Sequence, residues 1–469
     1  MRPKLDRQNQ LDFSPPPTKE TLKYHEKYEA ISDVIDANPE ILNSVQQDLE
    51  EPLKYAKTTG YGGRAATFTS DNVLRILIVM ILESMSLRRV TVQIDDNPFL
   101  RRFTRIHDKK MMSFTTLDKL KNSIRPETWV DVNQALASQA VAEELISGET
   151  LRIDTTAVPT NIHHPTDSFL LWDCYRVLAR LIGRAREIDA TVVGTGRLQV
   201  KLAKKINQRI SRSVGKKNSK ERLRKLYSQL IILVDTVLEW SSVIVQRLAL
   251  AESEESLDDV SNPSASAVIE DMEHYLPLCE AVRDQSWRRV ICGESVPNSE
   301  KIFSIFEDHT ELLKRGKSWG DIEYGHMTQI AQTSDKFIVD YEIFRDRPVE
   351  HKLLEPAIER HKSLFGSYPE TLATDRGYYD GETVKRLRTK IEVVSVPKSG
   401  GKRSEEEISH EHSWEFKQAQ KFRAGVEGSI SFLKRILGLW RCFSKGWAHY
   451  QCTIGLTVLA HNLLNLAVP

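Results

Sequence analysis

The clearest pattern of apolar and polar positions in this chain runs from Phe422 to Cys442. Read as an α-helix, the stretch has an apolar stripe at spacings of i, i+4, i+7 and i+11, which is typical of a buried face. A neighbouring edge of the same helix carries Arg423, Glu427 and Lys434 within roughly 40° of one another. The stretch therefore predicts a helix that packs on a core and displays one carboxylate between two cations. The stripe consists of Val426, Ile430, Leu433 and Leu437.

Two glycines, Gly425 and Gly428, flank the glutamate of this predicted helix. Each glycine is expected to cost a helix interior roughly 1 kcal/mol relative to alanine. We therefore expect something to approach the helix backbone closely at this point, either a β-strand or a strand of nucleic acid. The alternative is an ordinary amphipathic helix with surface salt bridges.

The N-terminal third of the chain predicts helices in two regions. Residues 1–60 are polar and form a helical accessory segment in this interpretation. Residues 61–148 are predicted to form a separate helical domain, in which a capping signal at Thr69 to Asp71 opens a strongly apolar helix. The helices predicted in this domain cover 73–85, 87–94, 99–104 and 113–124.

The later helices of that domain carry basic side chains, among them Arg101, Arg102 and Arg105. A row of short helices with basic residues is typical of a helix-turn-helix domain that binds DNA. The three arginines are therefore candidate DNA contacts. A plain helical bundle with a solvated basic face accounts for the same pattern equally well.

Residues 149–158 alternate as a β-strand does, with Leu151 and Ile153 on one face and Asp154 on the other. Aspartate is uncommon in strands, so its presence here needs a reason. One reason is that a sheet displays a carboxylate rigidly for metal binding. The simpler alternative is an aspartate at a strand end that bonds to a turn.

A long helical insertion is predicted over residues 169–320, where no convincing strand pattern occurs. Between Arg197 and Lys225 it contains twelve Lys or Arg residues and one acid, Glu221. Such a run is commonly a solvated face, but this density is also typical of contact with DNA phosphates, which is the interpretation we favour. The candidate DNA contacts selected from it are Lys204, Lys205, Arg209, Arg212, Lys216 and Lys217.

The second half of the chain predicts strands and helices in an order that favours an α/β fold with a mixed sheet flanked by helices. One short predicted strand ends on Asp375, and the carboxyl end of a strand in an open α/β sheet is where ligands bind. Residues 149–168 and 321–469 are predicted to form this domain together. The predicted elements are strands at 325–331, 337–344, 370–375 and 391–396, a helix at 348–364 and a helix ending at 387.

Asp154, Asp375 and Glu427 are thus three acids carried by two strands and a helix. Three converging carboxylates repel one another unless cations lie among them. Hard oxygen ligands at an open site suit Mg²⁺ or Mn²⁺, and two such ions support in-line attack on a phosphodiester. We therefore predict that the three acids are metal-binding and catalytic. Arg423 and Lys434 would hold DNA phosphates on the same helix edge.

Three motifs in the chain resemble those of the DDE transposases of bacterial insertion sequences, and within that group the ISNCY-type proteins. The resemblance covers most of the chain, from about Thr69 to Ala467. The motifs are Ile-Asp-Thr-Thr from Ile153 with a polar stretch at 161–168, Thr-Asp-Arg-Gly-Tyr from Thr374, and Arg-Ala-Gly-Val-Glu-Gly-Ser-Ile-Ser-Phe-Leu-Lys from Arg423.

This resemblance implies a ribonuclease-H-like catalytic domain whose metal-binding triad is Asp154, Asp375 and Glu427. It also matches Arg423 and Lys434 to the arginine and lysine of the family's glutamate signature. The chain departs from the family in having Gln420 where some groups have a tyrosine. The insertion also lies between the first and second strands, whereas several relatives insert before the glutamate helix.

The composition is that of a soluble globular protein, with 28% charged and 40% hydrophobic residues. A net charge of +1 neither supports nor excludes nucleic acid, because a local patch is sufficient to bind it. The five cysteines are scattered and indicate neither a disulfide framework nor a zinc site. We identify no apolar run that spans a bilayer and no signal peptide, so we expect a cytoplasmic protein, associated with the nucleoid when bound to DNA.

The sequence as a whole predicts a transposase that binds the terminal inverted repeats of its element, cuts them and joins the 3′ ends to target DNA. Its partner is double-stranded DNA, and by family analogy it acts as a homodimer or larger assembly. The alternatives are a ribonuclease-H-like nuclease without strand transfer and an inactive DNA-binding regulator. A two-carboxylate glycosidase is disfavoured, because basic surroundings do not suit a neutral sugar.

Overall fold

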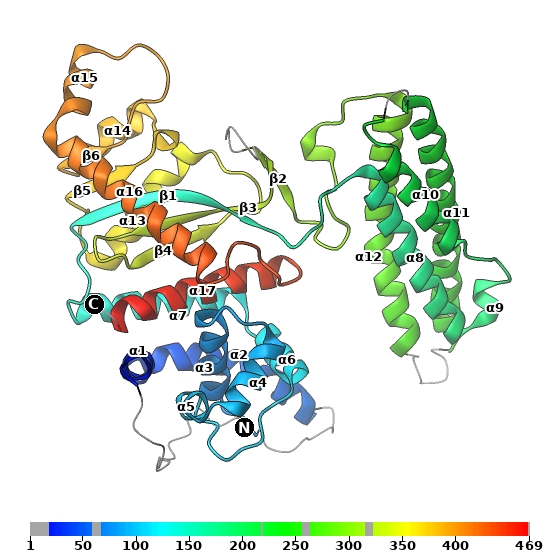
Figure 1. Ribbon diagram of the computed structural model, residues 1–469, viewed down its shortest axis with the longest axis horizontal. Helices are drawn as coiled ribbons and strands as arrows, with labels where there is room; N and C mark the ends of the chain where they lie inside the picture. Colours follow the sequence, from blue (N-terminus) through cyan, green and yellow to red (C-terminus); the bar gives the residue numbers. More distant parts are fainter. Residues whose placement is uncertain (1–17, 59–66, 217–218, 256–262, 315–321, 468–469) are drawn as a thin grey trace. The chain divides into compact units, whose positions relative to one another are not determined.

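The computed structural model describes residues 18–58, 67–216, 219–255, 263–314 and 322–467. Candidate Lys217 lies outside these residues, as do residues 1–17 and 59–60 of the accessory segment predicted over 1–60. The chain divides into two compact units, each described by itself (Figure 1). Met1–Thr160 and Gly325–Pro469 form the first, here called the main unit, and Asn161–Tyr324 form the second, here called the insertion unit.

Helices α1 to α7 form the N-terminal part of the main unit, and several of them pack against its C-terminal helix, α17 (Trp447–Ala467). Helix α3 is buried along its whole length, from Ser70 to Leu82. Thr69 and Asn72 form a capping box at its start, which confirms the predicted capping signal. The bounds are α1 Lys19–Ala37, α2 Pro39–Thr58, α3 Ser70–Leu82, α4 Leu87–Asp96, α5 Pro98–Phe103, α6 Phe114–Asn122 and α7 Pro126–Ala142.

One apolar core joins these helices to the sheet of the main unit. Its buried side chains come from the N-terminal helices, from α17, and from Val158 and Ile330 of the two central strands. Helices therefore occupy the region in which the sequence predicts a helix-turn-helix domain. The DNA-binding role of that region stays a prediction.

The sheet is mixed, with the strand order β2-β3-β1-β5-β6, and β4 pairs with β3. Strand β1 runs antiparallel to β3 and parallel to β5, and β5 runs parallel to β6. This arrangement confirms the predicted mixed α/β sheet flanked by helices and is compatible with a ribonuclease-H-like domain. The bounds are β1 Thr150–Pro159, β2 Glu311–Lys314, β3 Ile322–Gln332, β4 Ile338–Ile343, β5 Thr371–Thr374 and β6 Val393–Ser395.

Alternate side chains of β1 contact helices on opposite faces of the sheet. Helix α16 lies across β1 in Figure 1. Leu151 and Ile153 join an apolar core with α13 and α14. Arg152 and Asp154 instead contact α16. The predicted alternation is confirmed, and it places the aspartate on the face that α16 covers. The helices around the sheet are α13 Leu354–Phe365, α14 Gly381–Leu387, α15 Glu405–His412 and α16 Trp414–Arg435.

The chain leaves the sheet for the insertion and returns to it at neighbouring positions. Pro159, at the end of β1, pairs with Gly325 on β3, and the insertion unit occupies the residues between them. A side chain at Gly325 would collide with β1, because its Cβ would lie 2.1 Å from the carbonyl oxygen of Val158. The glycine therefore allows the two strands to pair closely where they begin to separate.

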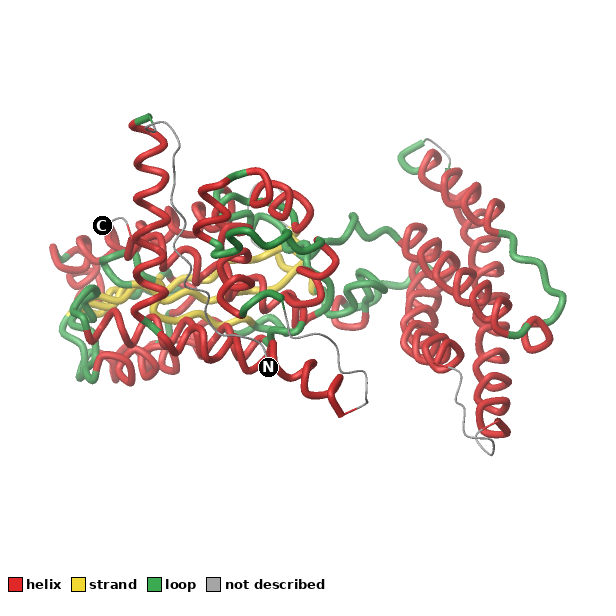
Figure 2. The backbone as a smooth tube through the Cα atoms, turned by 90° about the horizontal axis from the view of Figure 1, so that it is seen from below, coloured by secondary structure: helices red, strands yellow, loops and turns green. Residues whose placement is uncertain are grey.

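The insertion unit is a helical bundle with an apolar core of its own (Figure 2). Its longest helix, α11, is long and apolar enough between Lys220 and Leu250 to cross a membrane by length and composition, and 44% of its most apolar window is buried. Core helices of soluble proteins share these properties, so the finding is weak support for a membrane segment. The bounds are α8 Asp167–Ile188, α9 Ala190–Val193, α10 Val200–Ser213, α11 Lys220–Glu255, α12 Pro263–Ser286 and a π-helix at Trp287–Cys292.

Two sequence predictions are wrong in detail. The insertion is not helical throughout, because it contains strand β2, whose four residues are too few to show an alternating pattern. The glutamate helix begins at Trp414, earlier than predicted, and ends at Arg435. It stops there because Gly438 adopts a φ of 80° and Cys442 pairs with Thr160 beyond the end of β1.

Candidate active site

Asp154 and Asp375 occupy adjacent positions because β1 and β5 pair in parallel. The register pairs Ile153 with Thr374, so each aspartate is the next residue on its own chain segment. The carboxylate of Asp154 accepts a hydrogen bond from the backbone N–H of Thr155 at 2.8 Å. That of Asp375 accepts one from the N–H of Gly377 at 2.9 Å. Two of the three predicted acids are therefore fixed side by side by backbone geometry.

The pKa of the Asp154 carboxyl is raised to about 6, chiefly by burial and next by the negative charge of Asp375. The charge of Glu427 raises this pKa as well, whereas the Thr155 N–H and Arg423 lower it. Both of the other acids therefore act on Asp154 through space. The three carboxylates share one electrostatic environment in which an added negative charge is unfavourable.

Arg423 links two of these acids directly. Its Nη1 donates to Oδ2 of Asp154 at 3.4 Å, and its Nη2 donates to Oε1 of Glu427 at 2.9 Å. Glu427 lies one helical turn along α16 from this arginine, and its side chain is 64% exposed. The guanidinium thus partly neutralises a buried and an exposed carboxylate across the strand–helix boundary.

Lys434 fixes the other end of the same helix to the strand. Its ammonium donates to the carbonyl oxygen of Ala157 on β1 at 2.6 Å. Both predicted phosphate contacts on α16 therefore have partners within the protein. Their contact with phosphate stays a prediction.

Arg152, which the sequence did not single out as a site residue, connects β1 to α16 two residues before Asp154. Its guanidinium donates to Oε1 of Gln332 on β3 and to the carbonyl oxygen of Phe422 on α16, the latter at 2.8 Å. Arg152 is only 5% exposed, and burial lowers its pKa to about 10. Neutral oxygens hold this buried cation in place, and the Phe422 ring lies 4.8 Å from it.

The close approach predicted at the α16 glycines occurs at one of them. A Cβ on Gly425 would lie 2.1 Å from Nη1 of Arg152, whereas a Cβ on Gly428 would meet nothing within 4 Å. The approaching group is a side chain of β1. The expectation is therefore confirmed for Gly425, and for Gly428, where the approaching group would be nucleic acid, it stays a prediction.

Glu350 is a fourth acid near this site, and no sequence motif marks it. Its Oε1 accepts a hydrogen bond from the hydroxyl of Thr155 at 2.8 Å. Its Oε2 lies against Gly377, where a Cβ would be 2.1 Å away. The charges of Glu350, Asp154 and Asp375 together contribute to a raised pKa of the buried Tyr378 hydroxyl, after the larger effect of burial. Only the pairing of segments far apart in sequence brings Glu350 here.

Comparison with known proteins identifies the segment that carries most of this site. Residues 314–463 match the family described as transposase DDE domain. This segment is a transposase DDE domain. It contains Asp375, Glu427 and Arg423, while Asp154 lies upstream of the match. No curated protein and no solved structure matches the chain. The ISNCY subtype stays a prediction.

DDE transposases typically use divalent metal ions, and the carboxylates of this site suit such ions in their chemistry. Asp154 and Asp375 supply carboxylate oxygens from adjacent strands, and their repulsion is the kind that a divalent cation relieves. Within the described residues, no three His, Cys, Asp or Glu side chains are grouped so that they could hold a metal ion. Arg423 contacts Asp154 and Glu427 instead. The metal-binding role of the triad stays a prediction.

The candidate DNA contacts of the N-terminal helices all have partners within the protein. Arg105 pairs with Asp36 and Asp71, joining α3 to α1. Arg101 pairs with Asp95 and donates to the carbonyl oxygens of residues 107 and 109. Arg102 lies 3.8 Å from a carboxylate oxygen of Glu29. These contacts stabilise the fold, and a role in DNA binding is untested.

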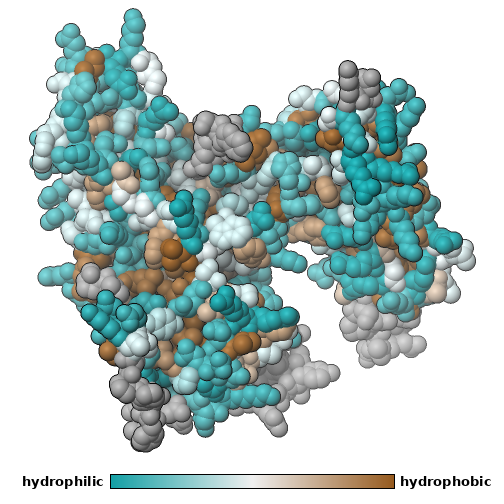
Figure 3. All heavy atoms as spheres, viewed as in Figure 1, coloured by the Kyte–Doolittle hydropathy of each residue, from teal (hydrophilic) through white to brown (hydrophobic). Residues whose placement is uncertain are grey.

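The candidate contacts of the insertion lie largely on α10, which presents basic residues on one face. Ala203, Ile206 and Ile210 are buried in the core of the insertion unit. The cations of this helix are all exposed, and none forms an ion pair with a residue in the described part of the chain. Hydrophilic side chains cover much of the insertion unit on the face shown in Figure 3. The exposed cations are Lys201, Lys204, Lys205, Arg209 and Arg212, and Lys216 follows just beyond the helix.

Proposed function

We propose that this protein is a transposase that cuts the ends of its own element and joins their 3′ ends to target DNA. The observation that carries this proposal is the pairing of Ile153 with Thr374, which puts an acid upstream of the matched family segment beside an acid within it. Glu427, on the helix that covers the same strand face, supplies the third carboxylate. A binder without catalytic activity would have no use for clustered acids beside DNA phosphates.

In this proposal Asp154 and Asp375 hold divalent ions from adjacent strands, and Glu427 holds one of them from α16. When bound, such ions activate a water or a 3′-hydroxyl and stabilise the leaving oxygen of the phosphodiester. Arg423 then exchanges its two carboxylates for a DNA phosphate, which a guanidinium binds through paired hydrogen bonds. The strand and the helix keep these groups aligned, because Arg152 and Lys434 tie α16 to β1.

The test uses the full chain with DNA that carries the ends of the surrounding element and a separate target duplex. With Mg²⁺ present, we expect nicks at the element ends and a covalently joined product of end and target. With EDTA we expect neither, although the DNA remains bound. Gel analysis of labelled ends and labelled target measures both steps.

The outcomes distinguish the three hypotheses, which are a transposase, a nuclease without strand transfer and a DNA-binding regulator. Cleavage without any joined product would support a ribonuclease-H-like nuclease. Binding without cleavage at any Mg²⁺ or Mn²⁺ concentration would support a regulator derived from a transposase. Either result would overturn strand transfer as the function of this chain.

We further propose that the exposed face of α10 contacts the DNA backbone. Replacing Lys201, Lys204, Lys205 and Arg209 by glutamine is expected to weaken binding equally for all sequences. If all four contact phosphates, the slope of log K against log salt falls in magnitude by up to about 3.6, because each contact contributes about 0.9. Affinities measured between about 50 and 200 mM salt determine this slope.

A matched variant controls for the loss of positive charge alone. Lys19, Lys23, Lys385 and Arg388 are exposed cations of the main unit outside the basic run. Replacing them by glutamine changes the net charge equally but is expected to leave the salt slope nearly unchanged. Equal slopes for the α10 variant and the wild type would refute the contact.

A further inference from the structure

The segment between α16 and α17, residues 436–446, exposes an unusual set of large apolar side chains. Trp440 is 54% exposed, Phe443 57% and Ile436 53%. The rings of Trp440 and Phe443 lie edge to face with centroids 5.4 Å apart. Contiguous exposed apolar side chains of this size mark a binding surface more often than scattered single ones do.

Hydrogen bonds fix the backbone conformation of this segment, and with it the outward position of the two aromatic rings. The N–H of Cys442 donates to the carbonyl oxygen of Pro159 at 2.8 Å, and those of Leu439 and Trp440 donate to carbonyls in the last turn of α16. Leu437, Leu439 and Cys442 are buried beneath the segment. The chain therefore presents the two rings outward while its alternate residues anchor it.

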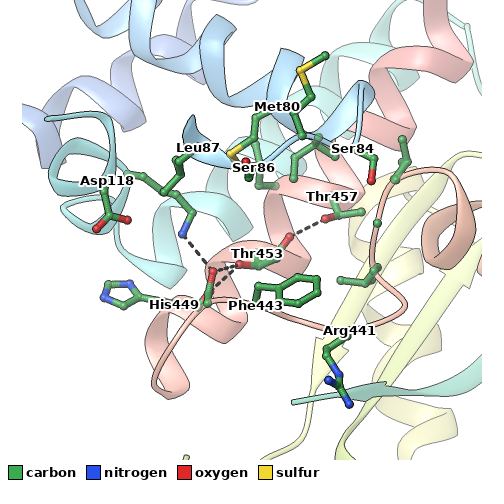
Figure 4. Close-up of a pocket in the computed structure, with 18 of the residues that line it drawn as sticks. Met80, Ser84, Ser86, Leu87, Asp118, Arg441, Phe443, His449, Thr453 and Thr457 are labelled. Carbon is green, nitrogen blue, oxygen red and sulfur yellow. Dashed lines mark hydrogen bonds between the residues drawn. The ribbon is translucent and has the colours of Figure 1, made fainter. Parts of the chain in front are cut away.

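The rings border a pocket of about 790 Å³ within the main unit (Figure 4). Met80 and Leu87 contribute to one wall, and Phe443, His449 and Thr453 contribute to the opposite wall. The pocket combines apolar sides with hydrogen-bonding groups. This combination suits a flat, polar-edged ring better than an aliphatic chain.

The charge of this region points to an anionic ligand. Lys121, Arg441 and Lys445 line the pocket, against one carboxylate, Asp118. No Asp or Glu occurs in the sequence after Glu427. The Arg441 guanidinium lies 5.8 Å from the centre of the Trp440 ring, so a cation and an aromatic face are presented together.

The ammonium of Lys121 adds a partly buried positive charge to this pocket. It donates to the hydroxyl of Ser444 at 3.1 Å, which is a neutral oxygen, and burial lowers its pKa. The Ser444 hydroxyl is also 2.6 Å from that of Thr453. A ligand that brings hydrogen-bond acceptors or negative charge would stabilise this cation.

We propose that this pocket and its aromatic border bind an unpaired base of the DNA end on which the carboxylates act. Stacking on Trp440 and Phe443 would hold the base, and the surrounding cations would hold the adjacent phosphates. A nucleotide is the ligand that combines an aromatic face, acceptors on its edge and a negative charge. The proposal rests on the proposed function, since it assumes that DNA lies along the carboxylate site.

The position of the pocket fits that assumption. Pro159, which bonds to the segment, is five residues beyond Asp154 on β1, or about 17 Å at the rise of a strand. The carbonyl oxygen of Lys434 accepts the N–H of Trp440. Lys434 is seven residues beyond Glu427, or about 10 Å along the helix. These spans correspond to roughly three to five nucleotide steps at about 3.4 Å per step.

The test compares two DNA probes: a fully paired duplex and the same duplex with a short unpaired tail. Binding is measured in EDTA, so that no chemistry is involved. Trp440→Ala and Phe443→Ala are expected to reduce affinity for the tailed probe roughly 5- to 100-fold and to leave affinity for the paired probe nearly unchanged. Trp440→Phe is expected to restore most of the loss, because it retains an aromatic face.

Trp414→Ala is the matched control, because Trp414 is 70% exposed at the start of α16 and lies outside the pocket lining. It is expected to bind both probes as the wild type does. Equal affinity of Trp440→Ala and wild type for the tailed probe would overturn the proposal, as would an equal loss for the paired probe. A change in sedimentation behaviour of Trp440→Ala without a change in DNA affinity would also overturn it, by assigning the surface to a second copy of the chain.

A fluorescent base analogue in the unpaired tail gives a second measurement. Its emission is expected to change on binding to the wild type and to remain that of free DNA with Trp440→Ala at saturating protein. Because these measurements need no metal and no joined product, they stand apart from the test of transposition. A selective loss with tailed DNA in a protein that joins nothing would support the base site while overturning the proposed strand transfer.

Discussion

Replacing Glu427 by glutamine is expected to lower the rate of strand transfer by more than about 100-fold, since even residues that only support metal ligands cost about 10- to 100-fold. The change removes one negative charge and keeps the size of the side chain. Its carbonyl oxygen can still accept the hydrogen bond from Arg423. The side chain is 64% exposed, so stability and DNA binding are expected to change little. The rate of joined-product formation in Mg²⁺ measures the effect.

Glu415→Gln is the control for this variant. Glu415 is an exposed glutamate in the first turn of the same helix, remote in sequence from the acid cluster. It is expected to join DNA at the wild-type rate. Wild-type strand transfer by Glu427→Gln, with binding and melting temperature intact, would remove Glu427 from the proposed triad.

Alanine substitutions at two neighbouring glycines are expected to have opposite effects. Gly428→Ala meets open space and is expected to stabilise α16 by up to about 1 kcal/mol. Gly425→Ala places a Cβ 2.1 Å from Nη1 of Arg152, and that guanidinium cannot swing away freely because it is buried and bonded to Gln332 and Phe422. Either α16 must shift, or the hydrogen bonds of Arg152 to Gln332 and Phe422 must break. Because a displacement of about 1 Å at an active site can cost about 100-fold, we expect a loss of that order in strand transfer.

The pair of variants separates positioning from stability. Melting temperature, DNA binding and joining rate are measured for each, together with the Mg²⁺ concentration that gives half the maximal rate. We expect Gly425→Ala to need more Mg²⁺ because its acids are misaligned, whereas Gly428→Ala retains the wild-type dependence. The double variant Arg152→Ala and Gly425→Ala relieves the collision, so its loss should be smaller than the product of the two single losses. Equal joining rates for the two glycine variants would show that the contact of Arg152 with α16 does not position the helix.

Much of the site was predictable because its parts follow local rules. Alternation in β1 identified the face of Asp154, and a strand followed by Asp375 and Gly377 identified an acid at a strand end. The apolar stripe of α16 identified the face that packs on the sheet, and Val426 and Leu433 are indeed buried. Each of these signals is contained within a dozen residues of sequence.

The other site features depend on pairing between distant segments, which no local pattern encodes. Glu350 reaches the site because its segment lies beside Gly377. Arg152 looks like an ordinary strand arginine until Gln332 and Phe422 are placed around it. The end of α16 is likewise set from outside, by the bridge between Cys442 and Thr160. The helix predicted to Cys442 therefore extends seven residues beyond the observed end of α16 at Arg435.

The pairing of Pro159 with Gly325 allows the insertion to vary in sequence and length. Because β1 and β3 are already paired where the insertion begins and ends, their pairing does not depend on the helices between them, and of the described strands only β2 lies wholly within the insertion. The helices α8 to α12 can lengthen, shorten or exchange their sequence while β1 keeps its register with β5 and Asp154 stays beside Asp375. Selection can thus remodel these helices without moving the two aspartates apart.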